Sequence, residues 1–165
     1  MATLLQLIKI GKLTKLDPVL GPASMEERFV YLLPRAVSWL TEKMPTEKST
    51  WNIEESPSEQ VDGLMELFCA GWPLTVKKRF KCLLYRNVHG IWELKTSDVR
   101  MFGWFPKKNH FIISDCGMAG YIKVHNLYHG YCTQAQRERD ILELNEPKFI
   151  VGDNPDDIVS NWNKT

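Results

Sequence analysis

The fold is decided by residues 83–131, LLYRNVHGIWELKTSDVRMFGWFPKKNHFIISDCGMAGYIKVHNLYHGY. This stretch consists of short β-branched and aromatic runs, and each run is ended by Gly, Pro or Asn. Such spacing is typical of an antiparallel meander. We predict strands over Lys81–Arg86, Ile91–Thr96, Val99–Phe105, His110–Asp115 and Tyr121–Val124, followed by a loop rich in Lys, His and Tyr.

Helical patterns flank the meander on both sides. Ser56 is a good N-cap, Pro57 suits the first helical position, and Glu59 completes a capping box. Apolar residues then recur at i, i+3, i+4 and i+7, which predicts one buried helical face made of Val61, Leu64, Met65 and Phe68. Gly71 and Pro73 end this helix, and a second helix is predicted over Gln134–Leu144.

The segment Ser24–Met44 has two interpretations. Ser24 and Glu27 form a capping-box pattern that favours a helix start, but Pro34 would then lie in the helix interior. A strand over Arg28–Leu33 followed by a helix from Pro34 to Lys43 avoids that conflict and is preferred. The expected fold class is therefore α+β, a twisted antiparallel sheet packed against N-terminal helices with a C-terminal helix. Its domain spans residues 24–144, with an N-terminal extension (1–23) and an acidic tail (145–165).

Composition indicates a globular protein without a membrane segment. Hydrophobic residues make up 44% and charged residues 25% of 165 residues, which is ordinary for a single globular domain. No apolar run approaches the roughly 20 residues of a membrane span, and we read no signal peptide in the first ten residues. The four cysteines are scattered without a CxxC, which favours reduced thiols and a cytoplasmic location.

The net charge of +1 conceals an uneven distribution along the chain. Residues 1–69 hold 7 Lys+Arg and 10 Asp+Glu, a net −3, and residues 141–165 hold 2 and 5, also −3. Residues 70–140 hold 12 and 5, a net +7. A basic middle between acidic arms indicates an anionic ligand for the middle, although chance variation along the chain is the simpler alternative.

Most hydrolase and metal motifs are missing. The sequence has no paired-carboxylate pattern, no phosphate-binding glycine motif and no GxSxG. His125, His129 and Cys132 have a spacing that could ligate a metal from a helix, but Gly130 argues against a continuous helix and no second ligand pair exists. We therefore expect neither a metal nor another cofactor.

Basic and aromatic side chains instead converge on the meander. Lys95 ends one predicted strand, Arg100 lies in the next, and the last strand and its loop carry Lys123, His125, Tyr128 and Tyr131. On one sheet face, Lys and Arg would hold phosphates, Tyr would stack on a base and His could move a proton. The alternative is that the cations are solvated strand residues and that the tyrosines are ordinary half-buried aromatics.

The order of these segments resembles the RelE/HigB group of the RelE/ParE toxin superfamily, including its phage-derived branch. The resemblance lies in GW-PL, KCLLYRNVHGIWELK, VRMFGWF, HFIISD and GYIKVHNLY, and its most specific parts are Gly90–Lys95 and Val99–Phe105. It covers Pro57–Leu144, and Arg28–Met44 would match the family's first strand and helix. It implies a toxin of a toxin–antitoxin system, namely a metal-independent endoribonuclease that cleaves mRNA free or on the ribosome. A cognate antitoxin would be its protein partner.

The family's chemistry is attack of the ribose 2′-hydroxyl on the adjacent phosphate, with basic side chains stabilising the charge. By resemblance, Lys95 and Arg100 hold the phosphate, Lys123 or His125 transfers protons, and Tyr128 matches the C-terminal tyrosine. The basic turn and a further aromatic are assigned to RNA binding through Lys77, Lys78, Arg79 and Tyr131. No metal is required by this assignment.

Two departures from the family leave a second function open. Lys123 is the only cation where the family has a basic pair, and Glu93 stands where one catalytic branch has Lys, although the phage-derived branch often has Glu there. A non-catalytic phage or mobile-element protein that binds a host protein or RNA is therefore the alternative. The acidic tail has two interpretations as well: either its aspartates shield the basic residues, or it packs on the sheet through Phe149, Ile150, Val151 and Ile158.

Overall fold

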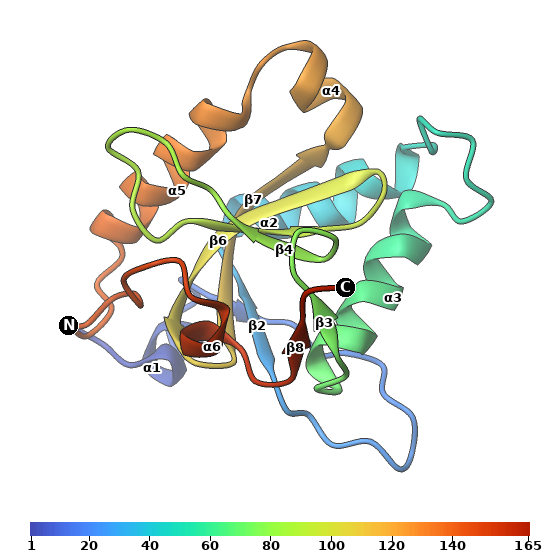
Figure 1. The fold of residues 1–165 in the computed structure, drawn as a ribbon. Helices are drawn as coiled ribbons and strands as arrows, with labels where there is room; N and C mark the ends of the chain where they lie inside the picture. Colours follow the sequence, from blue (N-terminus) through green and yellow to red (C-terminus); the bar gives the residue numbers. More distant parts are fainter.

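A six-stranded sheet lies between two helical layers in the computed structural model, which describes residues 1–165 (Figure 1). The strand order is β1-β2-β7-β6-β5-β4. Neighbouring strands are antiparallel except β2 and β7, which are parallel. The strands are β1 (Thr14–Lys15), β2 (Phe29–Leu32), β4 (Phe80–Cys82), β5 (Trp92–Lys95), β6 (Val99–Lys107) and β7 (His110–Met118).

Each face of the sheet has its own hydrophobic cluster, because successive strand residues point to opposite sides. The larger cluster has 22 buried residues and is covered by α2 (Pro34–Ser38), a π-helical turn (Trp39–Lys43), a 3-10 turn (Met44–Thr46) and α3 (Pro57–Cys69). The second has 15 buried residues and is covered by α1 (Leu4–Lys9), α4 (Ala119–Val124) and α5 (Tyr128–Ile141). We call these the α3 side and the α5 side of the sheet.

The α+β class is confirmed, but the sheet is mixed rather than antiparallel throughout. The predicted strands over Ile91–Thr96, Val99–Phe105 and His110–Asp115 match β5, β6 and β7, whereas the Lys81–Arg86 segment is extended only at its start. The prediction over Arg28–Leu33 corresponds to β2, which inserts beside β7 in parallel. Parallel pairing needs a long crossover, and α2, α3 and the first meander strands supply it here.

The predicted strand over Tyr121–Val124 is wrong, because this segment forms α4. β7 continues through the predicted break to Met118, and the chain then turns directly into the helix. Ala119 and Ile122 are buried at a helical i, i+3 spacing, which a period-two interpretation of so short a run cannot detect. The predicted loop after it is also mostly helix, since α5 begins at Tyr128, six residues before the predicted start at Gln134.

Helix α3 follows the sequence prediction closely. Ser56 Oγ accepts a hydrogen bond from the Glu59 backbone N–H, and the Glu59 side chain accepts one from the Ser56 backbone N–H. Gly71, with φ of 75°, lies just past the helix end in the left-handed region that glycine adopts without strain. The strand-then-helix interpretation around Pro34 is confirmed too, with Pro34 in the first turn of α2.

Both chain ends pack on the sheet. Leu7 and Leu13 of the N-terminal segment are buried on the α5 side. The tail forms α6 (Pro155–Ile158) and β8 (Trp162–Asn163), which pairs in parallel with β3 (Leu74–Thr75). These contacts favour the interpretation in which the tail packs on the sheet. Ile158 and Val159 are buried, whereas Val151, which the sequence also predicts to pack, is 75% exposed.

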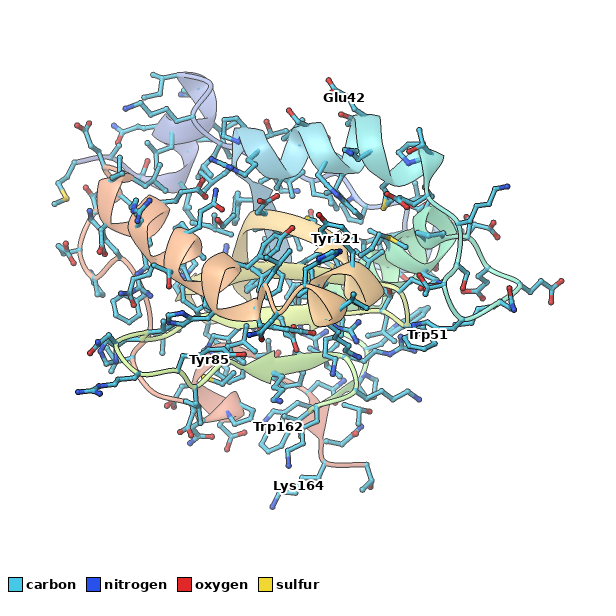
Figure 2. The ribbon with its side chains drawn as sticks, turned by 90° about the horizontal axis from the view of Figure 1, so that it is seen from above. Glu42, Trp51, Tyr85, Tyr121, Trp162 and Lys164 are labelled. Carbon is cyan, nitrogen blue, oxygen red and sulfur yellow. The ribbon has the colours of Figure 1, made fainter.

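A buried arginine ties the tail to α3. The Arg28 guanidinium donates to the carbonyls of Phe68 (2.9 Å), Trp72 (2.9 Å), Ser160 (2.7 Å) and Asn161 (3.1 Å). Arg28 is fully buried, and burial lowers its pKa to about 10. Figure 2 shows Trp162 and Lys164 well away from Tyr121 of α4, which agrees with a tail that does not cover the α4 end of the sheet.

No helix is long and apolar enough to cross a membrane. All four cysteines are free, and three of them are buried.

Candidate functional site

A groove on the α5 side gathers most of the residues that the sequence assigns to catalysis. Lys95 lies directly opposite Arg100 in the antiparallel β5–β6 pair. Lys123 comes from α4 and Tyr128 from the first turn of α5. The groove has a volume of about 260 Å³ and is lined by Lys81, Leu83, Tyr85, Glu93, Lys95, Arg100, Lys123 and Tyr128. We call it the basic groove.

The sheet register explains this convergence. Lys81 of β4 pairs with Glu93 of β5, and Glu93 pairs with Phe102 of β6. Residues directly opposite share a face, and residues two apart in a strand share it as well. Lys81, Glu93, Lys95 and Arg100 therefore project together toward α4 and α5.

Glu93 forms the floor of the basic groove and is only 2% exposed. Its Oε2 lies 4.0 Å from the Nε of Arg100 and accepts no hydrogen bond from the protein. Burial raises the pKa of Glu93, an effect that Arg100, Lys95, Lys81 and Lys123 only partly offset. A buried carboxylate that lies beside cations, lacks a hydrogen-bond partner and has a raised pKa is typical of a general base.

Arg100 is held rigidly beside this carboxylate. Its Nη1 donates to the carbonyl of Thr96 and, at 3.1 Å, to that of Val99, while its Nε donates to the Tyr128 hydroxyl at 3.1 Å. The Nη2 group donates to no acceptor in the chain and is not among the sealed polar atoms. Nη2 is therefore the part of the guanidinium that is open to a ligand.

The remaining polar groups supply protons and positive charge. The Tyr128 hydroxyl accepts from Arg100 and so keeps its own proton to donate, and burial raises its pKa. Burial lowers the pKa of Lys95, whose Nζ donates to the Lys77 carbonyl at 2.9 Å. Lys123 is exposed at the rim, with its Nζ 6.0 Å from the centre of the Trp51 ring.

Five of the nine predicted residues do not line the basic groove, namely His125, Tyr131 and the turn formed by Lys77, Lys78 and Arg79. The sequence predicts that His125 follows a strand, but it caps α4, is exposed, and packs on Tyr121 with ring centres 4.3 Å apart. Because Lys123 and His125 are two residues apart on a helix, their side chains diverge. Tyr131, three residues after Tyr128 in α5, stacks on Phe102 with ring centres 4.7 Å apart and does not line the groove, so its position gives no support to its assigned role in base stacking.

The basic turn predicted to bind RNA lies next to the groove. Lys77, Lys78 and Arg79 connect β3 to β4, and Lys77 has a φ of 68°. Lys95 contacts both ends of this turn, because its backbone N–H donates to the Arg79 carbonyl and its Nζ to that of Lys77. Lys77 and Lys78 are exposed and extend the positive surface beyond the groove.

Sequence reasoning missed the three polar lining residues Lys81, Tyr85 and Glu93, together with the apolar Leu83. A signal for Glu93 is present in the sequence, because Glu93 and Lys95 share a strand face by alternation. The resemblance marks Glu93 only as a position where one catalytic branch has Lys and the phage-derived branch often has Glu. The predicted meander already pairs the strand of Lys81 with Ile91–Thr96, but the register of that pair, and the course of the chain at Tyr85 beyond the end of β4, come only from the structure.

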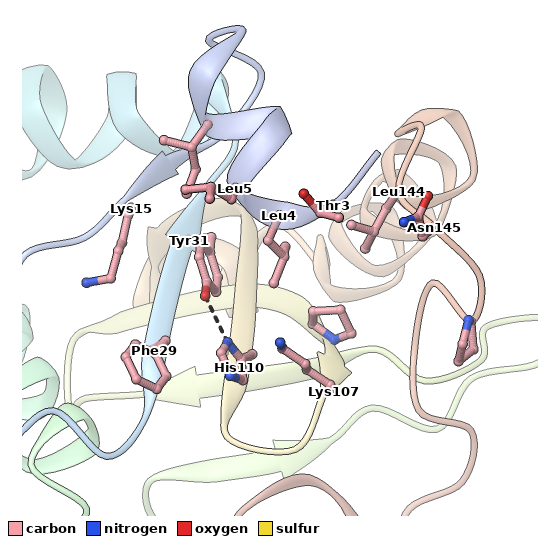
Figure 3. Close-up of a pocket in the computed structure, with 13 residues that line it drawn as sticks. Thr3, Leu4, Leu5, Lys15, Phe29, Tyr31, Lys107, His110, Leu144 and Asn145 are labelled. Atoms are coloured by element: carbon pink, nitrogen blue, oxygen red, sulfur yellow. Dashed lines mark hydrogen bonds between the residues drawn. The ribbon is translucent and has the colours of Figure 1, made fainter. Parts of the chain in front are cut away.

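A larger cavity, of about 490 Å³, forms where α1 and the segment after α5 meet the sheet (Figure 3). His110 packs against the rings of Phe29 and Tyr31, with ring centres 4.7 Å and 5.8 Å away, and its Nδ1 is 2.8 Å from the Tyr31 hydroxyl. Burial lowers the pKa of His110 to about 4. Lys15 is already paired with Glu26 at 2.8 Å, so this cavity offers less unpartnered charge than the basic groove.

The structure contains no group of three or more His, Cys, Asp or Glu side chains arranged to hold a metal ion. Cys132 is buried in the cluster on the α5 side, and the exposed His129 packs near Tyr85 with ring centres 5.5 Å apart.

Comparison with protein-family models, with curated proteins and with solved structures gives no match. Function is therefore inferred from the groove and its chemistry.

Proposed function

We propose that this protein is a RelE/HigB-like endoribonuclease toxin that cleaves mRNA at the basic groove without a metal. The observation that carries this proposal is the position of Glu93, a buried carboxylate that lines the groove, whose Oε2 has no hydrogen-bond partner and which is surrounded by Lys81, Lys95, Arg100 and Lys123. The cations favour a phosphate, and the carboxylate beside them can accept a proton.

The chemistry follows from these positions. Glu93 takes the proton from a ribose 2′-hydroxyl, and the 2′-oxygen attacks the adjacent phosphorus. The P–O5′ bond breaks, and Tyr128 donates its proton to the leaving 5′-oxygen. The products are a 2′,3′-cyclic phosphate and a 5′-hydroxyl. Arg100 and Lys95 stabilise the extra negative charge that builds on the phosphorane oxygens during the attack.

The test uses purified protein and labelled RNA in EDTA, both naked and on translating ribosomes. We expect cleavage that leaves cyclic phosphate ends. Lys123→Gln should slow this cleavage about tenfold or more, because it removes a cation at the rim of the groove. The fold should stay intact, since Lys123 is exposed. Lys108→Gln is the matched control, because Lys108 lies on the surface outside the groove. In bacteria, a folded Arg100→Ala variant should no longer inhibit growth.

A binding function without cleavage is the second candidate, and the bonding of Arg100 favours it. Its Nε and Nη1 already donate three hydrogen bonds within the protein, which leaves only Nη2 for a phosphate. In that case, RNA or a host protein would be retained by the wild type but RNA would stay intact. Intact RNA in both assays, with a correctly folded protein, would refute the nuclease and leave the binding function.

A further inference from the structure

A second groove, on the α3 side of the sheet, has the opposite charge. It lies between the chain after β1 and helix α3 and has a volume of about 770 Å³. Its apolar wall includes Leu16, Leu32, Leu40, Met44, Val61 and Met65. Its rim holds five carboxylates and no Lys or Arg: Asp17, Glu55, Glu59, Asp62 and Glu66. We call it the acidic groove.

Most of these carboxylates are not neutralised within the chain. Asp17 lies 3.7 Å from Lys15, and Glu59 accepts hydrogen bonds in the capping box of α3. Glu55, Asp62 and Glu66 have no Lys, Arg or His within 4.0 Å. Like charges this close repel one another, so the fold gains nothing electrostatically by collecting them here.

A glycine beside these acids points the same way. Gly63 lies inside α3, and no atom is within 4 Å of the position that a Cβ would occupy. Glycine in a helix interior costs roughly 0.5–1 kcal/mol relative to alanine, and neither packing nor a positive φ requires it here. A residue without a side chain lets another backbone approach α3 closely.

We propose that the acidic groove binds a basic amphipathic helix of a partner protein. The apolar stripe of such a helix would cover the wall of the groove, and Lys or Arg on either side of the stripe would reach the rim carboxylates while their stems pack on apolar surface. A small apolar ligand would leave the five acids unused, and RNA would be repelled by them.

This site is separate from the proposed RNA site. Leu32, Val61 and Met65 belong to the cluster on the α3 side, whereas the basic groove opens beside the cluster on the α5 side. The two grooves therefore lie on opposite faces of the sheet. Failure of either proposal leaves the other standing, because RNA cleavage and helix binding are measured on different faces.

The experiment uses the full chain and a synthetic 14-residue peptide with a fluorescein label. The peptide carries Leu at helical i, i+3, i+4 and i+7 positions and Lys at the others. Fluorescence anisotropy is measured at 0.15 M salt, with a scrambled peptide of the same composition and one with Glu for Lys as controls. We expect the patterned peptide to bind at least tenfold more tightly than either control.

Charge reversal then locates the site. Asp62→Lys/Glu66→Lys should weaken peptide binding at least tenfold. Glu143→Lys/Asp153→Lys changes the net charge equally at two exposed residues outside the groove and should change it less than threefold. A zero-length carbodiimide should couple peptide lysines to Glu55, Asp62 or Glu66. Any of three results would overturn the proposal. Both double variants could lose peptide affinity equally, the scrambled peptide could bind as tightly as the patterned one, or the cross-links could be confined to other carboxylates.

Discussion

Replacing Glu93 by Gln separates a catalytic carboxylate from a structural one. The substitution keeps the shape of the side chain and removes its charge. The structure predicts little loss of stability, because Oε2 accepts no hydrogen bond and Arg100 keeps its bonds to Thr96, Val99 and Tyr128. A carboxylate that served mainly to stabilise the fold would behave in the opposite way.

The magnitude follows from two opposing effects. At 4.0 Å the Glu93–Arg100 attraction is on the order of 4 kcal/mol at an effective dielectric constant of 20. Removing a carboxylate from water costs several kcal/mol, which is of similar size. Because burial raises the pKa of Glu93 despite four nearby cations, desolvation outweighs the attraction. We therefore expect Glu93→Gln to change the free energy of unfolding by no more than about 1–2 kcal/mol, and in the stabilising direction.

The pH dependence gives this prediction a sign. Since the pKa of Glu93 is raised on folding, the protonated form is favoured in the folded state. Wild-type stability should therefore fall, relative to the variant, as pH rises from 4.5 through the folded pKa. Well below pH 4.5 both proteins have a neutral side chain at this position in the folded and the unfolded state. The pH-dependent difference in stability between wild type and variant should then vanish. Urea unfolding in acid and at neutral pH measures this effect.

Activity should change far more than stability. Loss of a general base typically costs about 10²–10⁴-fold, so RNA cleavage in EDTA by Glu93→Gln should fall by about that factor. The rising limb of the pH–rate profile should disappear with it. Glu143→Gln, at an exposed residue, is the matched control. If Glu93→Gln lowered the free energy of unfolding by more than about 3 kcal/mol, Glu93 and Arg100 would form a structural ion pair. Cleavage by this variant at the wild-type rate would refute the assignment of Glu93 as the general base.

Three further substitutions test the fold. Arg28→Met should cost about 3–5 kcal/mol in urea unfolding, because four buried or partly buried carbonyl hydrogen bonds lose their donor, and limited proteolysis should then cut the tail first. Gly103→Ala should cost about 2 kcal/mol or more, since its Cβ would lie 1.8 Å from the Ile112 carbonyl oxygen; an unchanged melting temperature would contradict this close approach of β6 and β7. Gly63→Ala should instead raise stability by about 0.5–1 kcal/mol, seen as a higher melting temperature, and a lower one would show that α3 is distorted there.

Local sequence determined the elements whose signals are complete within a few residues. The capping box at Ser56 and the glycine at Gly71 fixed the ends of α3, because both act through hydrogen bonds and dihedrals of neighbouring residues. The alternation in Ile91–Thr96 and the short apolar, aromatic-rich run Val99–Phe105, bounded by turn residues, predicted β5 and β6 in the same way. The same alternation put Lys95 on one face with Glu93.

Tertiary contacts decided the segments with ambiguous local patterns. Residues 121–124 have apolar residues that suit a strand or a helix, and burial of Ile122 together with the Ala119–Asp98 backbone hydrogen bond selects the helix. The parallel place of β2 beside β7 depends on residues some 80 positions apart. No periodicity in either segment carries that information.

The candidate site divides along the same line. Lys95, Arg100 and Glu93 share a face because strand alternation and an antiparallel pair require it. Lys123 and Tyr128 join them only because α4 and α5 fold back over the sheet, and the same folding turns His125 away. Sequence thus determined which chemical groups the chain carries, whereas packing of the helices decided which of them meet, since side-chain direction on a helix depends on the helix's placement.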